Sequence, residues 1–467
     1  MYRRLGYSRA ICAATVVAGT VLLGPVGAAG AAPHAAGTIE TWPMFGQDPL
    51  HLGLSPDTAV GASTAPGLTT KWSKRLSSVH NQPSPVVAFN ATLKKTLVYD
   101  VTYGGVVTAY NASTGAQVWR RTVSPNVDST PAAYGNTLYF GDNEGTLEAL
   151  NAATGAVQCT FTLPVSPPAT KPGRIIGSPV VGIVDGTGPT VFFGDAGLAS
   201  ATEAQNGGHM WAVSGVGNTA GACKEKWVYK NWQNKGTNGS MTGVWDGAGL
   251  AQESTGTWAV VLGTSNPDNA VYALNAASGA RLWRFQTVQT GDDQDVGAGP
   301  TISAPGVNGF TDGVVYIDGK DGVEYALDLV TGQSIWSFTL GPGSASALAV
   351  STAALAGNTL VTAYSGTMFA LNATTGALIW QTTAGARFQA KPAGAFQASP
   401  AVSGAAGDQA LFVGNTNGHE YGLSLADGSV LFNATTASGI QDSTAVANGT
   451  LYFASNGTLY AYAPAAR

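Results

Sequence analysis

The residues best suited to chemistry in this sequence are acidic and lie close together. Asp292, Asp293 and Asp295 place three carboxylates within four residues of a chain in which only 10 % of the residues are charged. Carboxylates bind hard cations such as Ca²⁺ and act as general bases. A tight turn explains the same cluster without any chemistry. The stretch Lys320-Asp-Gly sets a cation beside an acid, but it is also typical of a hairpin turn.

Other functional patterns are missing from the sequence. The five histidines include no i, i+4 pair, which disfavours zinc chemistry. Neither a Gly-x-Ser-x-Gly elbow nor a phosphate-binding Gly-x-x-x-x-Gly-Lys loop occurs. The chain has 22 basic and 27 acidic residues, and no basic cluster follows the first ten residues. Nucleic acid is therefore not an expected partner. The low charge also disfavours long surface helices and coiled coils.

The candidate residues must be positioned by a repeated unit. Each copy has an apolar strand, a turn with Gly, a second strand ending in Ala-Leu-Asn or similar, a Thr-Gly turn, and a strand with Trp. The Asn of the turn caps its own backbone and the Gly takes a positive φ. Repeats of about 40–55 residues with several short strands are typical of propeller blades. The outer strands are marked by Trp72, Trp119, Cys159, Trp227, Trp283, Trp336, Trp380 and Phe432.

The repeat predicts an all-β fold. We expect residues 70–467 to form an eight-bladed β-propeller of four-stranded antiparallel blades. The Trp of each repeat is expected to fill the wedge between neighbouring sheets. The segment Thr70–Leu76 is an outer strand without inner strands, and Leu451–Tyr462 contains inner strands without an outer one. Pairing the N-terminal outer strand with the C-terminal inner strands would close the ring and remove exposed sheet edges.

The N-terminus has the pattern of a secretory signal. Arg3 and Arg4 precede the apolar stretch Ala10–Val26, and Ala29-Gly30-Ala31 is a small-residue cleavage site. We expect residues 1–31 to be a signal peptide and residues 32–69 to be a lead segment before the propeller. No second long apolar segment occurs. The mature protein is thus expected to be secreted or extracytoplasmic, without a membrane span.

Two cysteines remain in the expected mature chain. Cys159 and Cys223 would lie in an oxidising compartment, where cysteines often pair. Pairing requires Cα atoms within about 7 Å of each other. Two separate buried thiols are the alternative, and the sequence leaves both open.

The repeat resembles that of the quinoproteins, the propeller family of the pyrroloquinoline quinone (PQQ) dependent alcohol dehydrogenases. Its Ala-Leu-Asp/Asn-x-x-Thr-Gly-x-x-x-Trp pattern covers nearly the whole mature chain, and Trp42–Pro56 is similar to the family segment before the first blade. The resemblance implies eight blades. It does not fix the function, because some members carry no cofactor and act as assembly scaffolds.

The resemblance also implies roles for five residues, in the family's order along the chain. Glu203 and Asn266 match the segments that ligate Ca²⁺. Trp245 matches the Trp that stacks on the quinone ring, Asp295 matches the catalytic base, and Lys320 matches the cation at the quinone. Each also has an ordinary structural explanation, such as an exposed loop carboxylate, a blade wedge or a turn.

The sequence departs from the family in three ways. The adjacent cysteine pair that covers the quinone is missing, with Tyr103-Gly-Gly in that region, and the Arg beyond it has no counterpart. No Cys-x-x-Cys-His haem motif occurs, so an enzyme would need a separate electron acceptor. Two functions stay open: a PQQ- and Ca²⁺-dependent dehydrogenase of a small alcohol, or a non-catalytic extracytoplasmic propeller that binds a cell-surface ligand or acts as a scaffold. A polymer lyase or hydrolase has no residue cluster in its favour.

Overall fold

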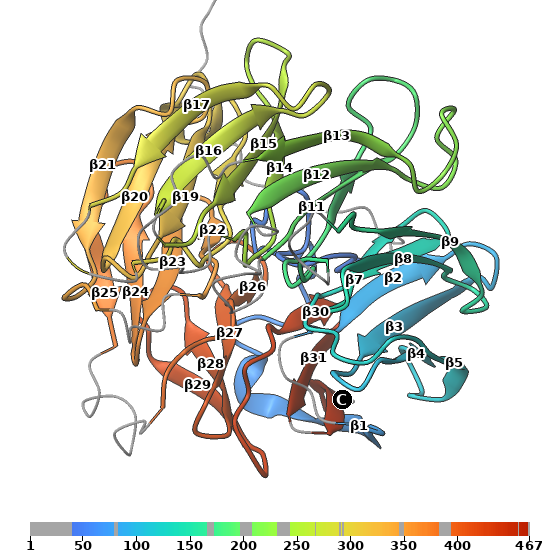
Figure 1. Cartoon of the computed structure of the whole chain (residues 1–467). Coiled ribbons are helices and arrows are strands. Elements are labelled where there is room, and N and C mark those ends of the chain that lie inside the picture. Colours follow the sequence, from blue (N-terminus) through green and yellow to red (C-terminus); the bar gives the residue numbers. More distant parts are fainter. Residues whose placement is uncertain are drawn as a thin grey trace, which may run out of the picture. The chain divides into compact units, whose positions relative to one another are not determined.

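The computed structural model of the chain describes residues 40–78, 83–165, 172–196, 208–230, 243–266, 268–288, 291, 294–344, 350–382, 394–455 and 457–465. In these residues, strands β1–β32 form eight four-stranded sheets (Figure 1). Every strand pair within a sheet is antiparallel; Val315 of β19, for example, lies opposite Leu327 of β20. The expected signal peptide, residues 1–31, lies outside the described residues. The predicted all-β, eight-bladed propeller is confirmed.

Seven sheets are each built from four consecutive strands. Blade 1 contains β2 (Val86–Asn90), β3 (Lys95–Val101), β4 (Val106–Asn111) and β5 (Gln117–Thr122). Blade 2 contains β6 (Ala132–Tyr134), β7 (Thr137–Gly141), β8 (Thr146–Asn151) and β9 (Val157–Thr162). Blade 3 contains β10 (Val180–Gly182), β11 (Thr190–Gly194), β12 (His209–Ser214) and β13 (Glu225–Lys230). Blade 4 contains β14 (Gly249–Gln252), β15 (Trp258–Gly263), β16 (Ala270–Asn275) and β17 (Arg281–Gln286).

The remaining blades follow the same order. Blade 5 contains β18 (Thr301–Ser303), β19 (Val314–Asp318), β20 (Val323–Asp328) and β21 (Ser334–Thr339). Blade 6 contains β22 (Ala354–Ala356), β23 (Thr359–Tyr364), β24 (Thr367–Asn372) and β25 (Leu378–Gln381). Blade 7 contains β26 (Ala401–Ser403), β27 (Ala410–Asn415), β28 (His419–Ser424) and β29 (Val430–Thr435). In the described residues, the short 3-10 helix η1 (Ala65–Gly67) directly precedes β1, and η3 (Val307–Gly309) lies between β18 and β19.

The eighth sheet joins the two ends of the described chain. It contains β30 (Ala445–Ala447), β31 (Thr450–Ser455), β32 (Thr458–Pro464) and β1 (Leu68–Arg75), with β1 on the outside. Its register runs from Leu68 opposite Pro464 to Arg75 opposite Thr458. The innermost strands β2 and β30 are neighbours, as are those of every other successive blade pair. The ring therefore closes within one sheet, as the unmatched strands in the sequence predicted.

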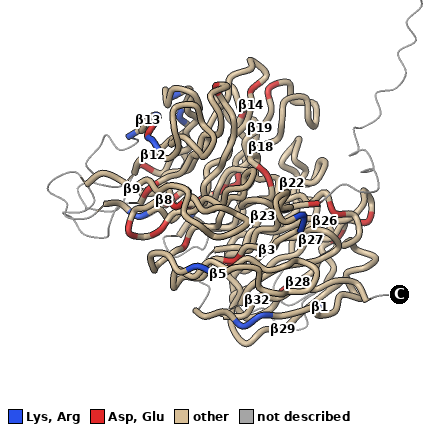
Figure 2. The backbone as a smooth tube through the Cα atoms, turned by 90° about the vertical axis from the view of Figure 1, so that its right-hand side faces the viewer, with Lys and Arg blue, Asp and Glu red and all other residues tan. Residues whose placement is uncertain are grey.

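The inner strands are apolar because sheets cover both of their faces. Strand β7 is buried along its whole length, whereas the outer strand β21 alternates between exposed and half-buried residues. A strand buried on both sides needs no alternation, so continuous apolar runs are expected there. Charged positions are sparse along the chain trace (Figure 2), which agrees with the 10 % charged composition.

Six tryptophans lock successive blades together. In each case the indole N–H donates to a backbone carbonyl in the Thr-Gly turn of the next blade. The pairs are Trp72–Ala112, Trp119–Ala152, Trp227–Ala276, Trp283–Leu329, Trp336–Ala373 and Trp380–Leu425, at 2.8–3.0 Å. The turn requires glycine for two reasons, the positive φ of its backbone and the close approach of the Trp ring. Gly332 has φ +68°, and a Cβ on it would lie 2.5 Å from the Trp283 ring.

The two other blade junctions use different chemistry. Cys159 occupies the Trp position of blade 2 and forms a disulfide with Cys223, between β12 and β13 of blade 3, with Cα atoms 5.9 Å apart. Of the two possibilities that the sequence left open, the structure has the paired one. Phe432 of blade 7 packs edge-on against Tyr462 of blade 8, with ring centroids 5.6 Å apart. Blade 8 lacks a Thr-Gly turn, so an aromatic contact replaces the hydrogen bond.

Replacing Trp283 with phenylalanine is expected to lower the free energy of unfolding by about 1–3 kcal/mol. The smaller ring keeps much of the apolar contact, but the buried carbonyl of Leu329 loses its donor. The midpoint of urea unfolding, followed by fluorescence, measures the change. Leu282→Ala is the matched control, because this neighbour on the same strand is 39 % exposed and should cost within about 0.5 kcal/mol. Equal losses of unfolding free energy in both variants would argue that the Trp283 hydrogen bond does not hold the two blades together.

The segment before β1 runs past the innermost strands of most blades. Backbone hydrogen bonds join Trp42 to Val87 in blade 1. Further along, Leu50, Leu52 and Gly53 accept from the innermost strands of blades 5, 6 and 7. The Ser55 hydroxyl then donates to the Val446 carbonyl of blade 8 at 2.7 Å. This lead segment therefore ties the innermost strands of the blades together at the axis.

Candidate functional site

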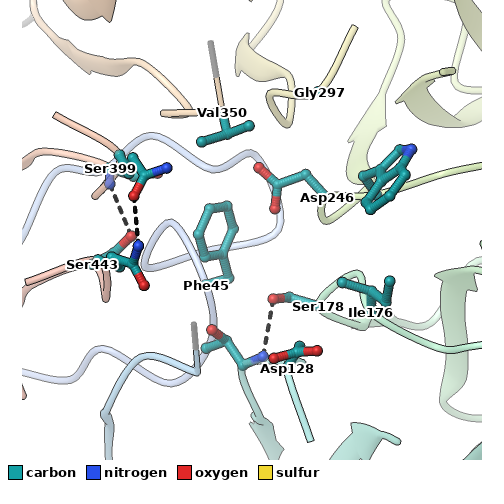
Figure 3. A pocket seen from close by; sticks show the side chains of 13 residues that line it. Phe45, Asp128, Ile176, Ser178, Asp246, Gly297, Val350, Ser399 and Ser443 are labelled. Atoms are coloured by element: carbon teal, nitrogen blue, oxygen red, sulfur yellow. Dashed lines mark hydrogen bonds between the residues drawn. The ribbon is translucent and has the colours of Figure 1, made fainter. Parts of the chain in front are cut away.

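A small cavity of about 120 Å³ lies at the axis. It is lined mainly by the segments that precede the innermost strands, and Phe45 of the lead segment projects into it (Figure 3). Two carboxylates, Asp128 before blade 2 and Asp246 before blade 4, also line it, together with Trp245. The cavity is below the roughly 300–1,000 Å³ of pockets that enclose drug-sized ligands.

A ring of hydroxyl groups surrounds this cavity. The backbone N–H at the start of one innermost strand donates to the Ser or Thr hydroxyl at the start of the next. The steps are Gly299–Thr352, Thr352–Ser399, Ser399–Ser443, Ser443–Ser84, Ser84–Thr130 and Thr130–Ser178, at 2.8–3.2 Å. Figure 3 draws the steps at Ser399–Ser443 and at Ser178. This hydroxyl ring satisfies buried N–H groups that would otherwise be costly.

Asp246 replaces the hydroxyl where the ring is interrupted. Blades 4 and 5 have Gly247 and Gly299 at the Ser/Thr position, and the Asp246 carboxylate accepts from both N–H groups, at 2.7 and 2.8 Å. It also accepts from the Thr352 hydroxyl at 2.9 Å. Burial raises the pKa of Asp246 to about 6. Sequence reasoning gave this residue no role. Aligning the repeats at their Ser-Pro and Thr-Pro pairs would have exposed the gap that it fills.

A second cluster joins three of the five residues singled out from the sequence. The Asp295 carboxylate accepts from the backbone N–H of Asn266 at 2.7 Å and pairs with Lys320 Nζ at 2.6 Å. Asn266 lies in the turn after β15, Asp295 lies before β18, and Lys320 lies in the turn after β19. The Lys320 N–H also donates to the Asp295 carbonyl at 2.9 Å. Segments of blades 4 and 5 therefore hold this carboxylate in a fixed place.

Trp245 lies apart from this cluster, in the wall of the axial cavity. Asn266, Asp295 and Lys320 are not among the residues that line the cavity. The two places are linked through Gly243, whose N–H donates to the Ser265 hydroxyl and whose carbonyl accepts the Ser265 N–H at 2.9 Å. The indole N–H of Trp245 is buried without a hydrogen bond among the described residues. Asn266, Asp295 and Lys320 therefore meet one another but not Trp245, and the described residues do not bring these four side chains into one cavity.

Three predicted positions lie outside the described residues: Glu203, Asp292 and Asp293. The described residues that flank Glu203 on either side are close together. Asp195 accepts from the His209 N–H at 2.8 Å, and His209 Nδ1 lies 3.0 Å from Asp195 Oδ2. The Trp211 indole donates to the same carboxylate at 2.9 Å. Sequence reasoning missed this His–Asp pair, because the two residues are separated by the Glu203 segment.

Of the two predicted Ca²⁺ ligands, Asn266 alone lies in the described residues, and its side-chain amide oxygen is a donor of the kind that Ca²⁺ accepts. The carboxylate of this cluster is Asp295, the predicted base, and its cation is Lys320, the predicted quinone contact. In the part of the chain that the structure describes, no group of three or more His, Cys, Asp or Glu side chains has the geometry of a metal site. The described residues therefore supply part of a site. The same part of the chain has no helix with the length and apolarity needed to cross a membrane.

The fold and repeat place the chain in the class of PQQ-type eight-bladed β-propellers. Residues 59–221 and 197–466 match the sequence model of the PQQ-repeat family described as outer membrane protein assembly factor BamB. The chain belongs to that family.

Individual relatives extend this picture without fixing the function. The chain is 24 % identical, over 65 % of its length, to the dehydrogenase subunit of a quinone alcohol dehydrogenase from Gluconacetobacter polyoxogenes, and spans 46 % of that protein. It resembles quinohemoprotein alcohol dehydrogenase from Comamonas testosteroni with a TM-score of 0.71 at 16 % identity, covering 91 % of this chain and 81 % of that one. BamB from Moraxella catarrhalis gives a TM-score of 0.59 at 17 % identity, covering 85 % and 99 %. At these identities the structural likeness shows the fold alone.

Proposed function

We propose that this protein is an extracytoplasmic quinoprotein that oxidises a small alcohol with PQQ and Ca²⁺. The observation that carries the proposal is the Asp295 carboxylate, held by the Asn266 N–H at 2.7 Å and by Lys320 Nζ at 2.6 Å. An enzyme of this type needs a carboxylate base beside a cation, and this chain of few charges builds one at the turns of blades 4 and 5. Export follows from the proposed signal peptide, residues 1–31.

Each residue of the proposed site has a separate task. Glu203 and the Asn266 side chain would hold Ca²⁺, and Trp245, which lies apart from the Asp295 cluster in the wall of the axial cavity, would offer its ring to the flat cofactor. Lys320 would donate to the cofactor's carbonyl oxygen, and its ion pair with Asp295 at 2.6 Å keeps that carboxylate in place. Asp295 removes the hydroxyl proton of the alcohol. When bound, PQQ supplies the two-electron acceptor for the hydrogen on the alcohol carbon. A separate acceptor then takes the electrons.

Reconstitution tests this function directly. The purified mature protein is incubated with PQQ and Ca²⁺, and dye reduction is followed with a series of small primary and secondary alcohols. We expect alcohol-dependent dye reduction that requires both PQQ and Ca²⁺. A protein that neither binds PQQ in equilibrium dialysis nor reduces the dye would refute the proposal.

A non-catalytic scaffold is the second candidate. The family match to an outer membrane assembly factor favours it, as do the missing cysteine pair and the single cation of the described cluster. In that case the Asp295–Lys320 pair only fixes the turns of blades 4 and 5. A folded, PQQ-free protein that captures a cell-envelope partner would support this candidate over the first.

A further inference from the structure

One blade of the eight carries acids where the others are apolar. In blade 5, Asp318 at the end of β19 lies opposite Glu324 on β20. The matching pairs in the other blades combine small or apolar residues, except that blade 7 has one acid. They are Val101–Val107, Gly141–Leu147, Gly194–Met210, Gly263–Val271, Ala363–Met368, Gly414–Glu420 and Ala454–Leu459. The ring fold therefore does not itself require a carboxylate here.

The acidic pair is buried and its oxygens are unpartnered. Asp318 is 2 % exposed and Glu324 is fully buried. Asp318 Oδ2 and both Glu324 oxygens have no hydrogen bond among the described residues. The Thr362 hydroxyl of β23, in the next blade, is also buried and makes no hydrogen bond of normal geometry among the described residues, but as a nearby side-chain donor it lowers the pKa of Glu324. Four oxygen atoms from two neighbouring blades are thus buried without a regular hydrogen bond among the described residues, and β20 and β23 belong to successive blades of the ring (Figure 1).

Among the described residues, the charged neighbours that act on Asp318 are all acidic, so none of them balances this charge. Burial, and then the charges of Glu324, Asp321 and Asp246, raise the pKa of Asp318 well above its usual range, and all three of these neighbours are acidic. Lys320, the nearest base in the sequence, is paired with Asp295. Burial also raises the pKa of Glu324 to about 8, so without a cation the pair is neutral only when each carboxyl holds a proton, and a single shared proton leaves an unfavourable buried charge. A divalent cation would neutralise both carboxylates.

We propose that Asp318 and Glu324, with the Thr362 hydroxyl, bind a hard divalent cation such as Ca²⁺ between blades 5 and 6. Carboxylates that bind through both oxygens, a hydroxyl and backbone carbonyls are the usual ligands of this ion. The bound cation crosslinks two neighbouring sheets and stabilises the closed ring. This site is distinct from the one that includes Asn266, and it does not depend on PQQ.

Calcium-dependent unfolding tests the site. The protein is stripped with EDTA and returned to calcium-free buffer without PQQ, in an Asn266→Ala background that removes the ligand of the other proposed site. Adding millimolar Ca²⁺ is expected to raise the thermal unfolding midpoint by several degrees, and equilibrium dialysis with ⁴⁵Ca²⁺ should find one bound ion. Both effects should disappear in Glu324→Gln and in Asp318→Asn, each of which keeps the side-chain shape.

Glu420→Gln is the matched control. Glu420 lies at the same position in blade 7 and is fully buried, but it faces Gly414 and accepts from the Thr444 hydroxyl at 2.7 Å. This variant should keep the calcium effect. The site is ruled out if calcium neither binds nor shifts unfolding, or if it does so equally in Glu324→Gln and Asp318→Asn. Calcium binding by a protein that never reduces the dye with PQQ would support this site while refuting the proposed dehydrogenase.

Discussion

Replacing Asp295 with asparagine is expected to reduce alcohol turnover of the PQQ- and Ca²⁺-loaded protein by a factor of about 10²–10⁴. The amide keeps the size of the side chain but cannot take the hydroxyl proton. Its oxygen can still accept the Asn266 N–H, which now lies 2.7 Å from the carboxylate. The loss should therefore appear in kcat, with PQQ affinity retained. Dye-reduction kinetics and equilibrium dialysis with PQQ measure the two quantities separately.

A surface ion pair provides the control for this substitution. Asp185 pairs with Lys226 at 2.5 Å on the outer part of blade 3, so Asp185→Asn also breaks an Asp–Lys pair. This variant should retain wild-type turnover. If Asp295→Asn turns over alcohol at the wild-type rate, Asp295 is not the base. If it loses PQQ binding together with turnover, Asp295 acts in positioning the cofactor and not in proton removal.

The fold could be predicted from the sequence because its key contacts lie within the repeat. The Trp four residues after the turn Gly marks most outer strands. Its hydrogen-bond partner, a turn carbonyl, lies in the next repeat, so both residues of this contact can be found in the sequence. Ring closure followed from the same count, since Thr70–Leu76 and Leu451–Tyr462 each lacked the strands that the other supplied. Asp246 and the hydroxyl ring were missed because they act between successive blades around the axis, and the Ser-Pro and Thr-Pro pairs were interpreted only as the starts of innermost strands.

The candidate site was predictable only as a list of positions. The family resemblance named Asn266, Asp295 and Lys320, and the structure brings these three together. The resemblance could not show that Trp245 lines the axial cavity, apart from the Asp295 cluster. The direction of an indole depends on the local backbone conformation, which a sequence match does not give. The acids of blade 5 were missed for a related reason. The alternation of side chains along β19 and β20 predicts which face of the sheet carries Asp318 and Glu324. Only the packing of the folded chain shows that the charged neighbours of Asp318 among the described residues are all acidic.

The second large effect is expected at the junction of blades 2 and 3, where Cys159 takes the place of the Trp. Replacing both Cys159 and Cys223 with serine is expected to lower the free energy of unfolding by about 4 kcal/mol, because the disulfide closes a chain segment of 64 residues in the unfolded state. The bond also holds blade 2 to blade 3, at the position where six other junctions have a buried indole hydrogen bond. Neither serine restores that contact, so the opening of the ring should begin here.

Urea unfolding with and without a reductant measures this effect. Reductant should lower the unfolding midpoint of the wild-type protein to that of the double variant, and it should leave the variant unchanged. Limited proteolysis of the variant should first cut between β9 and β13, the strands on either side of the lost bond. A variant that unfolds at the wild-type midpoint would mean that the apolar packing of blades 2 and 3 is sufficient by itself. The disulfide would then be dispensable for closing the ring.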